Sequence, residues 1–255
     1  MRGRATGRGR GRGQGAVAGG GGAADGPFGL NPAFWWRGDN LTDPDATELA
    51  TLVDQSANGH ILLNNGANNA TIEDGIAGTN NKRYFKAPAG NITCEYEKDG
   101  IITASSKAVT LFVALYYGTA NPAAGTHRYL QVAGERFYLQ VDQNNDDLES
   151  YSDDAVGGCN INVLGATGMK ICGLRWETAT GSNNGQRLYL NSLTAGATAA
   201  AAADTTLTGT SVTVLNDRGN SQVFSELLVY DSALDDTDFA TVMNGLGTYY
   251  GVTIT

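Results

Sequence analysis

The sequence has little of what cross-linked proteins and many enzymes depend on. Its 255 residues include three cysteines, two histidines and five prolines, and charged side chains make up only 17% of the chain. Cys94, Cys159 and Cys172 are odd in number and lack C-x-x-C spacing, which argues against a disulfide framework and against a zinc site. We expect all three to be small buried hydrophobic side chains.

Long apolar runs are also missing. No stretch is long and apolar enough to cross a bilayer, and the N-terminal segment combines positive charge with glycine and alanine rather than with the apolar core of a secretory signal. We therefore expect no membrane span, and a protein that is made in the cytoplasm and does not use the general secretory route.

Glycine is abundant, with 35 residues, and short segments rich in β-branched and aromatic residues recur between turns. HRYLQVAG and ERFYLQVD, which are separated by Gly134, alternate polar and apolar residues as a half-buried hairpin does. Residues 194–209 have low complexity and are interpreted as a surface loop. The expected fold is all-β, a two-sheet antiparallel sandwich, with strands over residues 82–87, 91–97, 108–118, 169–177, 186–191, 210–216 and 222–231.

One short amphipathic helix is predicted near the C-terminal end. Asp235 is placed to cap it, and we expect Gly245 and Gly247 to end it. The spacing i, i+3, i+4, i+7 gives the helix one apolar stripe, formed by Phe239, Val242, Met243 and Leu246.

The N-terminal segment differs in charge from the rest of the chain. All 26 acidic residues lie at Asp25 or beyond, so the remainder is more acidic than the formal net charge of −9. We predict an arm and a Gly/Ala linker over 1–26, disordered when free because it cannot bury apolar surface, and one domain over 27–255. The arm is expected to anchor the protein to a partner through five arginines, Arg2, Arg4, Arg8, Arg10 and Arg12.

Three motifs occur in the order found in a known family. The first motif is PAFWWRGDNLTDPDATELATLVDQSANGHIL, which contains a D-x-S-x-N-G turn from Asp54 to Gly59. It resembles the opening of laminin-G-like domains of the concanavalin A-like lectin/glucanase superfamily. GQRLYLNS is similar to an internal strand of these domains, and FSELLVYDSALDDTDFATVMNGLGTYYG resembles their closing strand and capped helix. The resemblance covers nearly all of 27–252 and implies a jelly roll of two curved sheets. This fold hosts lectins, glycosidases and structural modules, so it does not decide the function.

Catalytic patterns are weak. Glycosidases of this superfamily carry closely spaced carboxylates on one strand, because the acid and the nucleophile flank one bond. DDLESYSDD is not such a strand and lies between turn-like residues. A serine nucleophile elbow is also missing. We expect a protein that is not an enzyme.

A calcium loop has partial support in DQNNDDLESYSD. Asp142, Asn144 and Asp146 follow a D-x-N-x-D pattern, and Asp153 falls at the last ligand position of such a loop. Asp147 stands where the loop needs glycine, so a solvated acidic loop without a metal is the alternative. No other cofactor is expected.

The tryptophans offer a binding interpretation and a structural one. Trp36 and Trp176 are candidates for stacking on sugars, but a sandwich of this size also needs large aromatic side chains in its core. The RGD tripeptide at 37–39 follows the tryptophan-rich strand, and we interpret it as structural.

The combined features favour a virion protein. Cellular laminin-G-like domains are usually displayed outside the cell after secretion, whereas tailed-bacteriophage virion proteins with such domains need no secretory signal. We expect a capsid decoration or minor capsid protein, a homo-oligomer, whose arm binds the major capsid protein or other virion proteins. The alternative is a glycan-binding adhesin or a tail or fibre module that contacts host-surface glycans. Nucleic-acid binding by the arm is less favoured, because no aromatic residue is interleaved with its arginines.

Overall fold

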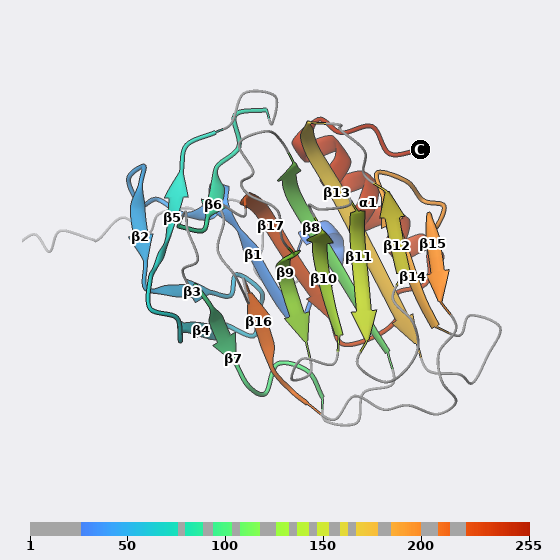
Figure 1. Ribbon diagram of the computed structural model, residues 1–255, viewed down its shortest axis with the longest axis horizontal. Helices are drawn as coiled ribbons and strands as arrows, with labels where there is room; N and C mark the ends of the chain where they lie inside the picture. The colour runs from blue at the N-terminus through green and yellow to red at the C-terminus, as the bar shows by residue number, and fades with distance from the viewer. Residues whose placement is uncertain are drawn as a thin grey trace, which may run out of the picture.

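The computed structural model describes most of the chain after the arm. The described residues are 27–75, 80–88, 94–103, 108–117, 126–132, 137–142, 147–152, 159–162, 167–177, 185–199, 209–214 and 223–255. Within them the chain forms two antiparallel sheets and one C-terminal helix, α1 (Asp236–Tyr250) (Figure 1). The predicted fold class, a two-sheet sandwich with one C-terminal helix, is confirmed.

The first sheet has nine strands among the described residues. The single-turn helices η1 (Pro27–Gly29) and η2 (Gly38–Asn40) flank β1 (Phe34–Arg37), which pairs with β17 beside the main strand order. That order is β15 (Ala197–Ala199), β14 (Gly185–Leu190), β13 (Gly168–Glu177), β8 (Ala108–Tyr117), β17 (Val223–Tyr230), β6 (Tyr84–Lys86), β5 (Ala70–Glu73) and β2 (Thr47–Leu49).

The second sheet has eight strands among the described residues and covers one face of the first. Its predicted hairpin is confirmed, with a register shift between Leu139 and Gln140. The strand order is β12 (Cys159–Asn162), β11 (Asp147–Ser152), β10 (Phe137–Asp142), β9 (Thr126–Val132), β16 (Val212–Val214), β7 (Tyr96–Lys98), β4 (Ile61–Asn64) and β3 (Thr51–Val53).

The nine-stranded sheet is buried on both faces near its centre. One face contributes to the core between the sheets, and the other packs against α1 through residues such as Phe112, Ile171 and Leu228. All eight residues of β17 are buried. A strand covered on both sides needs apolar residues at successive positions, which is why β8 and β17 are largely apolar rather than alternating, with Thr110, Ser225 and Glu226 as the buried polar exceptions.

Three local expectations were wrong. α1 continues through Gly245 and Gly247 to Tyr250, and Gly251 caps it with a positive φ of 71°. Part of the expected surface loop forms β15, an edge strand paired with β14. The acidic segment DLESYS is the strand β11, because pairing with β10 and β12 satisfies its backbone and only alternate residues need an apolar environment.

Candidate functional site

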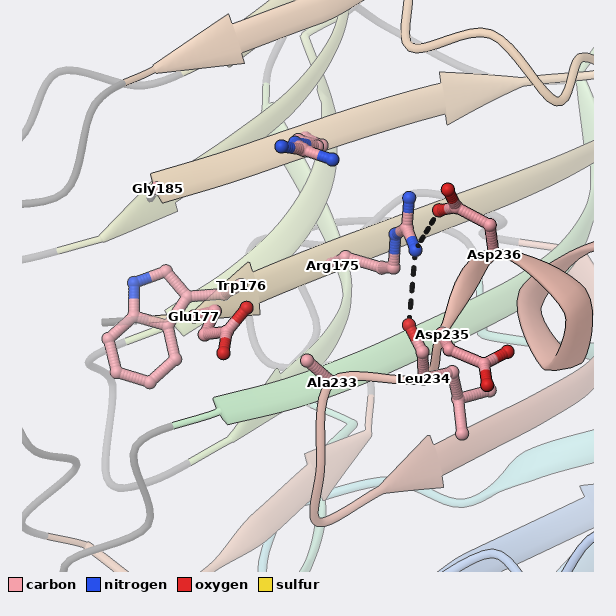
Figure 2. Close-up of a pocket in the computed structure, with 9 residues that line it drawn as sticks. Arg175, Trp176, Glu177, Gly185, Ala233, Leu234, Asp235 and Asp236 are labelled. Atoms are coloured by element: carbon pink, nitrogen blue, oxygen red, sulfur yellow. Dashed lines mark hydrogen bonds and ion pairs between the residues drawn. The ribbon is translucent and has the colours of Figure 1, made fainter. Parts of the chain in front are cut away.

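A groove lies on the outer face of the nine-stranded sheet, beside the first turn of α1. It consists of two neighbouring cavities of about 290 and 610 Å³. Both are lined by Arg175, Arg187 and Asp236, and we call the two together the α1 groove. Figure 2 shows its polar end, with Arg175 facing the start of α1.

Strand register brings the two arginines together. Arg175 of β13 lies directly opposite Arg187 of β14, and both side chains are on the face that carries α1 because the alternate residues Leu174 and Leu188 belong to the core between the sheets. Like charges directly opposite each other destabilise a sheet unless counter-charges are near. The N-terminus of α1 supplies such a counter-charge, the carboxylate of Asp236.

Arg175 is held in a fixed orientation. Its guanidinium donates to the hydroxyl of Tyr189 (2.7 and 3.2 Å) and to the carbonyl of Leu234 (3.1 Å), and it pairs with the Asp236 carboxylate at 2.7 Å. It also lies 4.7 Å from the ring centroid of Phe239. Burial opposes the charge, but the hydrogen bonds to Tyr189 and Asp236 outweigh burial, and the pKa of Arg175 is raised.

The start of α1 is specified by its sequence. Asp235 has extended backbone geometry, and its carboxylate accepts a hydrogen bond from the amide of Asp238 at 2.8 Å, as predicted for a capping residue. Two carboxylates in the first turn, Asp236 and Asp238, are favourable beside the positive end of the helix dipole. The helix thus presents acidic groups to the basic strands.

Charges of both signs line the groove. Arg175 and Arg187 face Asp235, Asp236 and Glu177, which also line the polar end. Guanidinium groups donate hydrogen bonds and carboxylates accept them. A neutral ligand with many hydroxyl groups can use both kinds, whereas a charged ligand would meet repulsion from one of them.

No cation site accompanies the groove. Among the residues that the structure describes, no group of three or more histidine, cysteine, aspartate or glutamate side chains is arranged to hold a metal ion. The three cysteines are buried and free, as expected, and burial raises the pKa of Cys172 to about 12 and of Cys94 to about 11. They carry no reactive chemistry in the folded protein.

The described residues do not test the expected calcium loop, which stays a prediction. Asn144, Asp146 and Asp153 lie outside the described residues, but the segment between them is informative: residues 147–152 form β11. Asp142 and Asp147 are opposite each other at the hairpin end, and the chain then runs away from them in extended conformation at roughly 3.3 Å per residue.

The two tryptophan candidates are buried. Trp36 has no exposed surface and packs edge-on against Phe85 and Phe224, with ring centroids 5.6 and 5.4 Å apart. Trp176 is 4% exposed, and its indole is turned away from Arg175 in Figure 2, into the core between the sheets. The expected sugar contacts are therefore wrong, because neither ring has a face available for stacking.

The family-like motifs are structural. The carboxylate of Asp54 accepts hydrogen bonds from the amides of Trp35, Ser56 and His60 and from the Ser56 hydroxyl, which fastens the D-x-S-x-N-G turn to β1. In the RGD tripeptide, Arg37 pairs with buried Glu226 at 2.8 Å. Asp39 is also engaged in the fold, as expected.

No pattern in the sequence pointed directly to the groove. Arg187 and Tyr189 alternate within RLYL, and this alternation could have placed them on one face of β14. Which residues of β13 and α1 face them follows only from the tertiary structure. The five arginines of the predicted arm, Arg2 to Arg12, lie outside the described residues. No helix in the described part of the chain is long and apolar enough to span a membrane.

Comparisons with known proteins show the fold. No protein-family model matches the chain, and no curated protein matches it in sequence. The receptor-binding domain of the botulinum neurotoxin C/D mosaic serotype superposes with a TM-score of 0.58 at 10% identity, covering 88% of this chain and 55% of that one. The binding domain of botulinum neurotoxin DC in complex with SialylT superposes with a TM-score of 0.58 at 10% identity, covering 85% of this chain and 52% of that one.

An enzyme shares the same fold. Trypanosoma rangeli sialidase in complex with sialic acid superposes with a TM-score of 0.52 at 10% identity, covering 84% of this chain and 32% of that one. The chain therefore spans about half the length of the neurotoxin domains and a third of the sialidase. At this identity the likeness establishes the two-sheet sandwich fold alone.

Proposed function

We propose that the protein is a carbohydrate-binding module and that the α1 groove is its binding site for neutral oligosaccharides. The groove carries the proposal, because two arginines and three carboxylates from β13, β14 and the start of α1 line it together. The neurotoxin domains of similar fold support carbohydrate binding in general, since one of them is described in complex with SialylT and another in connection with two ganglioside molecules.

Binding without hydrolysis is part of the proposal. A glycosidase needs two carboxyl groups free to act on one bond. In the groove Asp235 caps α1 and Asp236 is paired with Arg175, so two of the three carboxylates already have a structural partner. Bound oligosaccharides should be recovered intact after long incubation with the protein; release of shorter products would contradict this.

The test is a glycan array followed by titration calorimetry on the full chain. We expect micromolar binding of neutral oligosaccharides, and a loss of about tenfold in affinity for Arg187→Gln, since a hydrogen bond to a charged group contributes about 1.5 kcal/mol or more. Lys86→Gln is the matched control, because Lys86 carries the same charge on the same sheet beside Glu73, outside the groove. A silent array would overturn the proposal.

A virion role is a second proposal. Five arginines at 2–12 precede an acidic remainder, which supports anchoring of the arm on an acidic surface of a larger assembly, such as the capsid of a bacteriophage. Deleting residues 1–15 should abolish co-sedimentation with purified capsids while glycan binding persists. Equal binding of the full and the shortened chain to capsids, or no binding by either, would contradict it.

A further inference from the structure

The α1 groove has an apolar end as well as a polar one. Arg175, Arg187 and Glu177 line the polar end, beside the start of α1. The other end runs between α1 and the turn that joins β14 to β15. Its lining combines four side chains that carry only carbon with three that carry a hydroxyl group: Leu193, Ala195, Phe239 and Ala240, and Tyr189, Thr194 and Thr198. A ligand that fills the whole groove therefore meets an apolar wall at this end in addition to polar groups.

Leu193 is the exposed part of the apolar wall. It is 41% exposed and is one of four large hydrophobic residues in the described part of the chain that remain so accessible. Phe239 is 2% exposed and forms the base rather than the rim. An exposed leucine beside a cavity gains free energy when a ligand covers it, at roughly 25 cal/mol for each Å² buried.

Backbone hydrogen bonds fix the turn that carries Leu193. Its amide donates to the carbonyl of Thr255 at 2.7 Å, and the amide of Thr255 donates to the carbonyl of Asn191 at 3.1 Å. The Ser192 hydroxyl donates to the same Thr255 carbonyl at 2.9 Å. The apolar wall is thus pre-organised, so a ligand need not order it on binding.

Polar groups meet the apolar wall at Arg187 and Asp236, which line both cavities. Asp236 uses one carboxylate oxygen for Arg175, and its side chain is 91% exposed, so its carboxylate can accept a further hydrogen bond. A guanidinium donor, a carboxylate acceptor and a methyl-sized apolar surface occur together here. An acetamido group has the complementary set: a carbonyl acceptor, an N–H donor and a methyl group.

We propose that the groove selects neutral sugars that carry an N-acetyl group, with the acetamido methyl against Leu193 and its polar atoms at Arg187 and Asp236. This inference rests on the proposed carbohydrate-binding function and narrows it to a ligand class. The acetamido group adds no net charge, in keeping with the charges of both signs that line the groove.

Matched oligosaccharides test the proposal. Chitotetraose and cellotetraose share one linkage and differ at the acetamido group, and a second pair consists of N-acetylgalactosamine and galactose oligosaccharides. Calorimetry on the full chain should show about tenfold tighter binding of the acetylated member of at least one pair, since a buried methyl group and one added hydrogen bond together give about 1.5 kcal/mol.

Leu193→Ser locates the preference. This change should reduce the ratio of affinities for the acetylated and the non-acetylated oligosaccharide to about threefold or less. Because the Leu193 side chain is exposed, the fold does not depend on it. Leu63→Ser is the control, because Leu63 is 56% exposed but lies on β4 of the other sheet. The control should keep the wild-type ratio.

The outcomes separate this inference from the proposed function. Equal binding of both members of each pair would overturn the acetamido preference and leave carbohydrate binding standing. An unchanged ratio in Leu193→Ser would overturn the assignment of the apolar wall. Binding of acidic glycans alone would contradict the neutral ligand class, and no binding of any oligosaccharide would overturn the proposed function and this inference together.

Discussion

Asp39 shows how a single carboxylate joins distant parts of this chain. One oxygen accepts a hydrogen bond from the amide of Arg83 at 2.7 Å, and the other accepts from the hydroxyl of Tyr249 at 2.7 Å and from Lys82 at 3.2 Å. Partial burial opposes ionisation, but these three donors outweigh it and lower the pKa of Asp39. The ionised form is thus stabilised by folding.

Asp39→Asn should destabilise the protein in a pH-dependent way. Because the pKa in the folded state lies below the unfolded value of about 3.9, the stabilisation is complete above pH 5 and is lost as the pH falls through the folded pKa. We expect a loss of about 1 to 2 kcal/mol in the free energy of unfolding at pH 7. The difference from wild type should shrink towards pH 3.

Urea denaturation across this pH range measures the effect. Asp74→Asn is the control, since its side chain is 69% exposed and its ion pair with Arg83 is screened by solvent. A difference between wild type and Asp39→Asn that stays constant from pH 7 to pH 3 would show that ionisation of Asp39 does not stabilise the fold.

At the scale of elements, α1 contains glycines because other segments approach it closely. A Cβ on Gly245 would lie 2.3 Å from the ring of Phe28, and one on Gly247 would lie 2.7 Å from the carbonyl oxygen of Val252 and 2.5 Å from Ile254. Helix propensity alone predicts that α1 ends at these glycines. The packing contacts made through the two positions outweigh the loss of helix stability, which is about 1 kcal/mol per glycine. The helix therefore continues to Tyr250.

Gly247→Ala should separate these two effects. On propensity alone the change would stabilise the helix by about 1 kcal/mol. Because the new methyl group meets backbone as well as side-chain atoms, we expect destabilisation by about 1 to 3 kcal/mol instead. Thermal unfolding followed by circular dichroism measures it, with exposed Thr248→Ala as a control that should be neutral or slightly stabilising.

At the scale of the whole molecule, Glu226 links β1, β17 and α1. Its fully buried carboxylate accepts hydrogen bonds from the indole of Trp35 (2.8 Å), the guanidinium of Arg37 (2.8 and 2.9 Å) and the hydroxyl of Tyr250 (3.1 Å). Removing one partner of a buried ion pair leaves the other charge uncompensated. The first described strand and the last helix therefore depend on one side chain.

Glu226→Gln should weaken the whole fold by about 3 to 5 kcal/mol, because Arg37 then stays buried without an opposite charge. Double replacement by Arg37→Met and Glu226→Leu should cost less than Glu226→Gln alone. Tryptophan fluorescence and circular dichroism should give one shared unfolding midpoint for each variant. A loss below about 1 kcal/mol in Glu226→Gln would contradict the central role of this ion pair.

Elements with local patterns could be predicted from the amino-acid sequence. The apolar runs of β8 and β17, the alternation in β9 and β10, and the spacing of the α1 stripe were all predictable, because each follows from which faces of a strand or helix are buried. The family-like motifs also gave the correct sandwich. They act through hydrogen bonds such as those of Asp54, which hold the fold rather than bind a ligand.

Only the tertiary structure decided which side chains meet. It buried Trp36 and Trp176 between the sheets, since exposure is a property of packing and not of residue type. It placed Arg175 opposite Arg187 through the register of two strands and brought Asp236 to Arg175 from an element some sixty positions later in the chain. Strand register and helix docking are set by long-range contacts, so no local pattern could have specified the α1 groove.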